Sequence, residues 1–336
     1  MKRGIAYFGV RNPERVRDDL EEIRAAGFTH VLHTWSEEDM QYYPRTMNEI
    51  IGISVDLGLK VYVNPWGIGR VFGGEAYSEI TARDHSLCQV SLDGKPKVAA
   101  CPNQPDFRAY MHRWIDAVCA SRVETIFWDE PHFYFEKGHL ENWACLCPEC
   151  KKKFREAFGY DMPGELTPDV KLFRENSLVE FLAEMTRDVH AHGKRNSVCM
   201  LPPWFPAGLD NWDSVAKLES VDEIACDPYW ERGASEDSIQ KNYARVSARI
   251  FEIAGRFGKE PQMWVKNYQI ESGRENDLRI ATDEIRKAGI ENIFAWSFKG
   301  NAYLSALASD NPNAVWAVQV SSFQLSDSSF KQTTTN

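Results

Sequence analysis

Short runs of β-branched and aromatic residues alternate along this chain with longer segments whose apolar residues recur every three or four positions. The short runs predict strands, and the longer segments predict amphipathic helices. The expected strands are Gly4–Val10, Thr29–His33, Lys60–Asn64, Glu124–Trp128, Ser197–Leu201, Asp222–Cys226, Gln262–Val265 and Asn292–Trp296. The expected helices include Pro13–Ala26, Asp106–Ala120, Ser177–His192, Ser238–Phe257 and Arg274–Ala288.

Eight strand-then-helix units predict an α/β fold, a single (β/α)8 TIM barrel over residues 1–320. Gly27, Gly58 and Gly289 mark places where a helix stops before the next strand. A doubly wound open sheet is the alternative, but no Gly-x-Gly-x-x-Gly follows the first strand, and we expect no organic cofactor. The Ser/Thr/Gln-rich stretch 321–336 is expected to be a flexible tail.

The composition is that of a soluble globular protein of 336 residues, 43% of them hydrophobic, with a net charge of -10. This charge disfavours nucleic acids and anionic membranes as partners, because both bind basic surfaces. The N-terminus lacks the apolar segment of a signal peptide, and no stretch reaches the ~18 apolar residues of a membrane span. We therefore expect a cytoplasmic protein with a small neutral or cationic substrate, and the pattern leaves room for a homo-oligomer.

Four cysteines lie in the two longest loops, 65–105 and 129–169, which follow the third and fourth expected strands. Three of them form a Cys-x-Cys-x-x-Cys motif in a polar stretch, although free cysteine is normally a buried residue type. Closely spaced thiols reduce the entropy lost in assembling a zinc site, and a site closed by four thiolates is structural. The expected Zn²⁺ ligands are Cys101, Cys145, Cys147 and Cys150, with His132 and His139 as reserve ligands.

The fourth expected strand stops abruptly at two carboxylates, in the sequence Trp128-Asp129-Glu130-Pro131. In a barrel this places both acids at the catalytic mouth, with consecutive side chains pointing in different directions. We assign Glu130 as the proton donor and Asp129 as the residue that orients it or holds a substrate hydroxyl. The neighbouring aromatic side chains favour a raised carboxyl pKa, which a general acid requires.

Other strand ends carry tryptophans and hydrogen-bonding side chains, and the sixth strand again ends in an acid, Asp227-Pro228-Tyr229. Such a rim suits sugars, because their C–H faces stack on aromatic rings while their hydroxyls need donors and acceptors. The predicted substrate contacts are His33, Trp35, Asn64, Trp66, His132, Trp204, Tyr229, Lys266, Asn267, Trp296 and Lys299.

Four stretches in the middle of the chain resemble glycoside hydrolase family 42, the zinc-knotted β-galactosidases built on a retaining (β/α)8 barrel. They are 101–108, Asp129-Glu130, the cysteine motif with the following Phe154-Arg155, and 221–229. The resemblance implies structural zinc on the four cysteines and Glu130 as the acid/base. It also implies that Asp227 and Tyr229 contact the substrate.

Two positions depart from that family. Asp129 stands where the family has asparagine, and Lys266 stands where the family has its nucleophilic glutamate, so that the nearest acid there is Glu271. Retention requires two carboxyls ~5–5.5 Å apart, and inversion requires ~6.5–9.5 Å. The partner of Glu130 is therefore Glu271, Asp227 or Asp129.

The sequence thus predicts a glycoside hydrolase for a small saccharide or glycoside, with Glu130 as general acid and three candidates for the second carboxylate. Two alternatives stay open. One is a barrel that binds carbohydrate without hydrolysing it. The other is a lyase or isomerase in which Lys266 serves as base or Schiff-base former.

Overall fold

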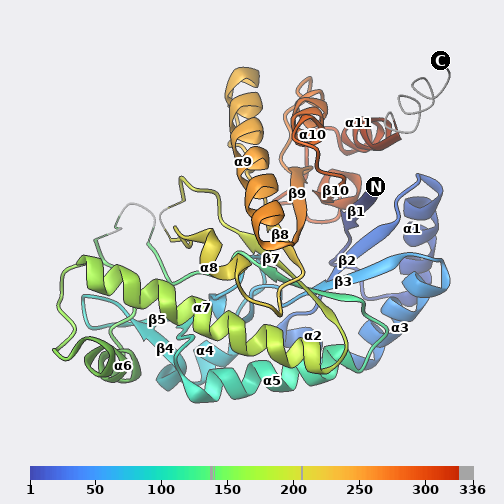
Figure 1. Cartoon of the computed structure of the whole chain (residues 1–336). Coiled ribbons are helices and arrows are strands. Elements are labelled where there is room, and N and C mark those ends of the chain that lie inside the picture. Colours follow the sequence, from blue (N-terminus) through green and yellow to red (C-terminus); the bar gives the residue numbers. More distant parts are fainter. Residues whose placement is uncertain (137–138, 140, 206, 325–336) are drawn as a thin grey trace. The chain divides into compact units, whose positions relative to one another are not determined.

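The computed structural model describes residues 1–136, 139, 141–205 and 207–324. Eight parallel strands form a closed barrel in the spatial order β1-β2-β3-β6-β7-β8-β9-β10, which confirms the predicted fold class (Figure 1). A separate two-stranded sheet joins β4 and β5. The strands are β1 Lys2–Ala6, β2 His30–Thr34, β3 Lys60–Asn64, β4 Cys88–Val90, β5 Pro96–Ala100, β6 Thr125–Asp129, β7 Arg195–Met200, β8 Glu223–Cys226, β9 Glu260–Lys266 and β10 Asn292–Trp296.

The barrel strands lie close to their predicted positions, but β1 ends at Ala6 and not at Val10. Gly9 adopts a φ of 80°, which breaks the extended path of the backbone. Asn12 then caps the first helix, where its side chain accepts a hydrogen bond from the backbone N–H of Glu14 at 3.0 Å. The apolar run therefore overestimates the length of this strand.

Helices follow the barrel strands, and one of them begins much earlier than its apolar pattern predicts. α7 starts at Pro168 because Thr167 caps it, accepting a hydrogen bond from the N–H of Val170 at 3.4 Å. The helices are α1 Pro13–Ala25, α2 Glu37–Tyr42, α3 Pro44–Asp56, α4 Glu79–Arg83, α5 Pro105–Cys119, α6 Pro148–Phe158, α7 Pro168–Ala191, α8 Trp212–Ala216, α9 Glu236–Phe257, α10 Asp277–Lys287 and α11 Pro312–Gln324.

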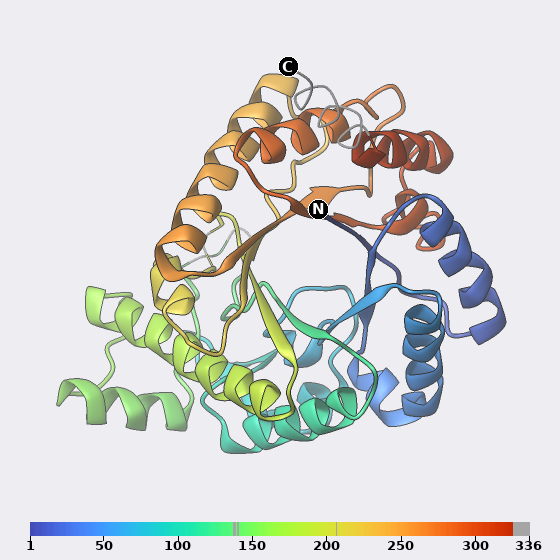
Figure 2. The same cartoon turned by 45° about the vertical axis from the view of Figure 1, so that its right-hand side comes forward.

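The chain divides into two compact units, of which unit 2 comprises Thr34–Pro44 and Val63–Asp222. In unit 2, α5 and α7 lie side by side in both views (Figures 1 and 2). The long loop predicted after β3 contains the antiparallel hairpin β4–β5. A β-bridge between Ser91 and Ala144 joins this hairpin to the loop after β6. The two long loops are thus connected through their backbones.

Unit 1 comprises Met1–His33, Arg45–Tyr62 and the chain from Glu223 onward. Its helices α9 and α10 pack against each other, and α11 contacts α10. α11 continues past the boundary predicted at residue 320, and the rest of the predicted tail, 325–336, lies outside the described residues.

A buried polar network closes the N-terminal ends of the strands in unit 1. Glu223 is fully buried, and its carboxylate accepts hydrogen bonds from the Tyr62 hydroxyl and the Lys2 ammonium, both at 2.8 Å. Lys2 also pairs with Glu260 at 2.7 Å. In a (β/α)8 barrel this end serves stability, and catalysis occupies the opposite end.

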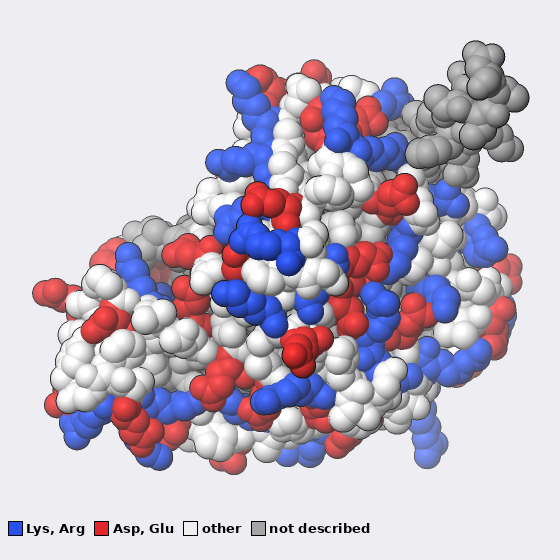
Figure 3. All heavy atoms as spheres, viewed as in Figure 1, with Lys and Arg blue, Asp and Glu red and all other residues white. Residues whose placement is uncertain are grey.

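Acidic and basic side chains are interspersed over the face of the molecule that Figure 3 shows. No large field of a single sign covers that face. Among the described residues, no helix combines the length and the apolarity that a membrane crossing demands.

Candidate functional site

The end of β6 carries the two carboxylates that the sequence singles out. Asp129 is the last residue of β6, and Glu130 follows with a φ of 45°. This left-handed backbone is uncommon for residues other than glycine and occurs often at functional sites. The N–H of Glu130 donates to the carbonyl of Cys199 at 3.1 Å, and the carbonyl of Asp129 accepts from the N–H of Gly73 at 2.9 Å. The Asp129–Glu130 turn is therefore hydrogen-bonded to β7 on one side and to the loop after β3 on the other.

Both carboxylates converge on Gly73, in the loop after β3. A Cβ atom at this glycine would lie 2.8 Å from Glu130 Oε2 and 3.1 Å from Asp129 Oδ2. Two oxygens that each lie about 3 Å from one point are closer together than the ~6.5 Å that an inverting pair requires. The pair is thus compact, and only a residue without a side chain fits beside it.

Burial raises the pKa of the Asp129 carboxyl well above its ordinary value, and the neighbouring Glu130 raises it further. The amide of Asn64 opposes this shift by donating a hydrogen bond to Asp129 Oδ2 at 3.2 Å. Burial also raises the pKa of Glu75, a third acid in the same loop as Gly73. Because two adjacent, partly buried carboxylates disfavour a double negative charge, the pair retains a proton at pH values where an exposed acid has lost it.

A buried glutamate braces the loop that carries Gly73. The Glu37 carboxylate accepts hydrogen bonds from the N–H of Gly69 at 2.9 Å, the N–H of Ile80 at 2.9 Å and the hydroxyl of Ser78 at 2.8 Å. Since Glu37 is 5% exposed, these bonds form away from water and hold the loop firmly. By fixing this loop, the Glu37 hydrogen bonds help to keep Gly73 beside the Asp129–Glu130 pair.

The four cysteines predicted as zinc ligands form one buried cluster. Their sulfur atoms all lie within 4.8 Å of one another, with Cys101 Sγ 3.3 Å from Cys150 Sγ and 3.7 Å from Cys147 Sγ. A tetrahedral ion with Zn–S bonds of ~2.3 Å places its sulfurs about 3.8 Å apart. The donor set and its spacing fit Zn²⁺.

Backbone and side-chain N–H groups point at these sulfurs, as expected around thiolate ligands. Cys145 Sγ accepts from the N–H groups of Val90 and Cys147, each at 3.4 Å. Cys150 Sγ accepts from the Asn103 amide at 3.3 Å. Because Val90 belongs to the β4–β5 hairpin and Cys145 to the loop after β6, the cluster connects the same two loops as the β-bridge.

The end of β9 carries a lysine. Lys266 is 3% exposed, its ammonium donates to the carbonyl of Trp230 at 2.7 Å, and it lies 4.9 Å from the centre of the Tyr268 ring. Burial lowers the pKa of Lys266 to about 8, and the positive charge of Arg232 acts in the same direction. A lysine of this kind is partly neutral near physiological pH.

The other two predicted acids lie in unit 1 as well. Asp227 directly follows β8 and is 6% exposed. Burial raises the pKa of Tyr243, and the charge of Asp227 adds to this shift. Glu271 accepts a hydrogen bond from the N–H of Gly233 at 2.9 Å and pairs with Arg232 at 3.8 Å. These contacts make Glu271 a brace between two loops of unit 1. Its role as the partner of Glu130 stays a prediction, as does that of Asp227.

Several predicted substrate contacts are buried in a barrel strand or directly after one. Both ring nitrogens of His33 are engaged, with Ser54 Oγ at 2.8 Å and the Tyr7 carbonyl at 3.2 Å, and burial lowers its pKa to about 4. Trp35 is fully buried, and Asn267 donates its amide hydrogen to the carbonyl of Ser297 at 3.2 Å. Their assignment as substrate contacts rests on the sequence alone.

The remaining predicted contacts divide by surroundings. The Trp66 ring packs on Gly74, and burial lowers the pKa of His132, whose Nδ1 lies 2.6 Å from the Glu130 carbonyl. Trp204 is 42% exposed in the loop after β7. In unit 1, three further residues contact aromatic or acidic neighbours. The ring centres of Tyr229 and Tyr268 lie 5.4 Å apart, and those of Trp296 and Phe8 lie 4.6 Å apart. The Lys299 ammonium lies 2.6 Å from the Glu22 carboxylate.

The sequence did not point to three residues that shape the acidic site, namely Gly73, Glu75 and Glu37. Gly73 and Glu75 lie in the loop after β3, whose length was the available signal. Glu37 is the first residue of a short helix, where an acidic side chain is common and gives no sign of a special role.

Solved structures of saccharide-active barrels share this fold at low sequence identity. The endo-1,4-β-mannanase from Rhizomucor miehei is 9% identical over 96% of this chain and 94% of its own, with a TM-score of 0.66. GH5_18 from Streptomyces cattleya, solved with GlcNAc, is 11% identical over 99% of this chain and 81% of its own, with a TM-score of 0.62. These similarities establish the (β/α)8 fold.

A third similar structure is the PgaB (BpsB) glycoside hydrolase domain from Bordetella bronchiseptica. It is 11% identical over 95% of this chain and 99% of its own, with a TM-score of 0.62. No protein-family model and no curated protein sequence matches this chain. The resemblance to family 42 therefore stays a prediction from the sequence motifs.

Proposed function

We propose that this protein is a glycoside hydrolase that acts on a small saccharide or glycoside, with Glu130 as the general acid. The observation that carries the proposal is the convergence of Glu130 and Asp129 on Gly73, at a strand end where burial raises a carboxyl pKa. A proton held by such a pair is available for the oxygen of a leaving group. The saccharide-active barrels with the same fold support this reaction class.

Within the pair, Asp129 is our candidate for the second carboxylate. It shares a proton with Glu130 and accepts a hydrogen bond from the Asn64 amide. In this arrangement Glu130 delivers the proton, and Asp129 holds a substrate hydroxyl or stabilises the developing positive charge. Asp227 and Glu271 remain the other two candidates. Retaining or inverting stereochemistry follows from whichever carboxylate lies opposite Glu130.

We also propose that the cysteine cluster holds a structural Zn²⁺ ion. Cys101, Cys145, Cys147 and Cys150 would close its coordination sphere, so that no position is open for water or substrate. When bound, the ion would link the two loops through its coordination bonds and would take no part in the reaction.

The test is a screen of aryl glycosides and oligosaccharides, followed by the Glu130→Gln variant on any substrate that is turned over. We expect kcat to fall by about 10²–10⁴-fold, the contribution of a positioned general acid. The exposed Glu156, on α6, gives the control Glu156→Gln. Unchanged turnover in Glu130→Gln would remove Glu130 from the mechanism.

Lys266 supports a second candidate, a lyase or isomerase, because burial lowers its pKa to about 8. A neutral lysine amine attacks a carbonyl to form a Schiff base, with loss of water. Borohydride reduction would trap that adduct on Lys266 during turnover. A substrate that is turned over without any trapped adduct eliminates the Schiff-base form of this candidate. If the protein binds saccharides but turns none over, the third reading, a non-hydrolytic carbohydrate-binding barrel, replaces both.

A further inference from the structure

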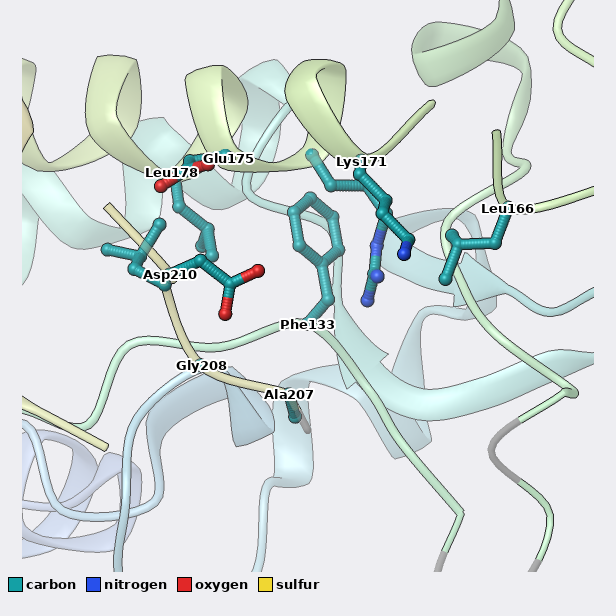
Figure 4. A pocket seen from close by; sticks show the side chains of 10 residues that line it. Phe133, Leu166, Lys171, Glu175, Leu178, Ala207, Gly208 and Asp210 are labelled. Atoms are coloured by element: carbon teal, nitrogen blue, oxygen red, sulfur yellow. The ribbon is translucent and has the colours of Figure 1, made fainter. Parts of the chain in front are cut away.

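A cavity of about 270 Å³ lies in unit 2 between α7 and the loops that follow β6 and β7 (Figure 4). Phe133 and Leu178 form apolar parts of its wall. Lys171 and Arg174, one turn apart on α7, contribute positive charge, and Asp210 contributes negative charge from the loop after β7. At ~30 Å³ for each water molecule of the liquid, this volume corresponds to about nine waters, which is room for one sugar ring.

Arg174 is a partly buried cation whose guanidinium lies against aromatic rings. Its guanidinium carbon lies 5.0 Å from the centre of the Phe133 ring and 6.0 Å from that of Trp143. Its Nε atom is buried and has no hydrogen-bond acceptor among the residues that the structure describes. An arginine side chain is charged at neutral pH. Burying a charged donor without an acceptor is costly, so an anion bound beside this guanidinium, which lines the cavity, would be favourable.

The cysteine cluster does not supply that partner. Cys145 and Cys150 lie close enough to favour the charge of Arg174 electrostatically. The sulfur of Cys150 nevertheless takes its hydrogen bond from Asn103, and Arg174 Nε remains without an acceptor within the described part of the chain. The cysteine sulfurs therefore lie near Arg174 without accepting a hydrogen bond from its Nε atom.

The charges within the cavity are separated. Figure 4 shows Lys171 on the α7 side and the Asp210 carboxylate on the other side of the Phe133 ring. Within the described residues, the Lys171 ammonium has no ion pair. Glu175, the other acid at the wall, accepts a hydrogen bond from the N–H of Asn211 at 2.7 Å.

We propose that this cavity binds the carboxylate of a uronic acid residue within the saccharide substrate. The planar carboxylate matches the fork of Arg174 and pairs with Lys171. The apolar face of the sugar ring lies against Phe133, and the ring hydroxyls donate to Asp210 at the opposite end. Phe133 follows Glu130 in the chain, separated only by Pro131 and His132, so the cavity wall and the acidic pair belong to the same loop.

This inference rests on the proposed function, because it names the substrate class of the same enzyme. Binding is therefore measured apart from turnover, by calorimetry on the full chain carrying Glu130→Gln. D-glucuronate is the probe, D-glucose is the neutral control, and sodium sulfate is the control for a simple anion. We expect glucuronate to bind at least 10-fold more tightly than either control, the difference that one hydrogen bond to a charged group supplies. Equal binding of glucose overturns the carboxylate site, and equal binding of sulfate overturns its sugar component.

Variants at the wall locate the site. Arg174→Met should weaken glucuronate about 10–100-fold, as expected for a buried charged hydrogen bond. Lys171→Met should weaken it about 2–5-fold, as expected for an exposed ion pair. Lys152→Met, at an exposed position on α6, removes the same charge outside the cavity and should leave affinity unchanged.

Lys171 is exposed, so its variant tests the site even if Arg174→Met disturbs the neighbouring cysteine cluster. Unchanged affinity in Lys171→Met and in a folded Arg174→Met protein overturns the proposal. Glucuronate binding without hydrolysis of any glycoside leaves the carboxylate site standing and removes the proposed function. Hydrolysis of neutral glycosides without glucuronate binding supports the proposed function and overturns the carboxylate site.

Discussion

The ends of β6 and β9 both bury ionisable groups, but by different means. At β6, two carboxylates share one small space, and each of the surrounding loops is fixed by hydrogen bonds, a β-bridge and a thiol cluster. At β9, a single lysine lies between aromatic rings and donates to one backbone carbonyl. Burial favours the neutral form of both groups, so it raises the acid pKa at β6 and lowers the lysine pKa at β9.

The difference shows that the loops around the end of β6 are held by more contacts than the lysine at the end of β9. The carboxylate pair needs external support, because two acids repel each other when they lose their proton. The lysine needs little support, since its aromatic neighbours attract the cation even as burial disfavours it. We therefore expect changes near β6 to have large effects through geometry, and changes near β9 to have small effects through charge.

The largest expected effect comes from Cys150→Ser, which should abolish the proposed zinc binding and loosen both loops. Structural zinc contributes ~10–16 kcal/mol of binding free energy in small domains, so we expect much of the local order to depend on the proposed ion. Metal analysis and thermal melting should show lost zinc and a lowered Tm. Cys119→Ser, at a buried thiol outside the cluster, should retain the metal. Wild-type protein that contains no zinc would contradict the role of the cluster.

Gly73→Ala should reduce turnover by about 10²-fold, the effect of displacing a reacting group by about 1 Å. The added methyl would have to displace Glu130 or Asp129, since it would lie 2.8 Å and 3.1 Å from their oxygens. Gly255→Ala is the matched control, because a Cβ there meets nothing within 4 Å. Full activity in Gly73→Ala would show that the pair is less confined than its geometry indicates.

Glu37→Gln should destabilise the fold by about 1–3 kcal/mol, the cost of leaving buried donors poorly satisfied. The amide offers one oxygen and an NH₂ group where three donors now meet a carboxylate. Urea denaturation measures the difference, with the exposed Glu49→Gln as control. If both variants were equally stable, the loop after β3 would not depend on this brace.

Asp129→Asn should raise Tm by a few degrees at neutral pH while lowering activity. The folded-state pKa of Asp129 is raised, so its contribution to stability is complete below the ordinary pKa of ~3.9 and is lost as pH rises. The advantage of the asparagine variant should therefore vanish on acidification. A variant that is less stable than the wild type at pH 7 would mean that Asp129 is well solvated or paired.

Lys266→Met should produce the smallest change, a modest gain in stability at pH 7. Burial lowers the folded-state pKa of Lys266 from 10.5 to about 8. The cost of burying its ammonium is therefore present below pH 8 and disappears as pH rises toward 10.5. Melting curves from pH 7 to pH 10.5 should converge for the two proteins. A gain that persists at the alkaline end would reflect packing of methionine and not charge.

The alternation of strands and helices was sufficient to predict the barrel, because each strand run is apolar and each helix has a distinct apolar face. The cysteine cluster was also predictable, since the spacing of Cys145, Cys147 and Cys150 is local. The hairpin β4–β5 was missed, although Asp93-Gly94 is a strong turn signal with Gly94 at a φ of 77°.

The contacts that complete the acidic site were not predictable in the same way. Gly73 and Glu37 act through approach distances and hydrogen bonds between segments far apart in the sequence, which no local pattern encodes. In the sequence, Arg174 is one more charged residue on a long helix, and only its position over the Phe133 ring distinguishes it. Strand ends were informative because a barrel brings them to one rim, whereas helix side chains carry no comparable rule.

The cysteine cluster also limits how this protein can change over evolutionary time or in the hands of an engineer. The loop with Cys101 and the loop with Cys145 meet in one cluster of cysteine sulfurs, so an insertion or deletion in either must be accommodated by the other. The two loops therefore behave as one inherited module, and moving the acidic site onto another barrel would require transplanting both together.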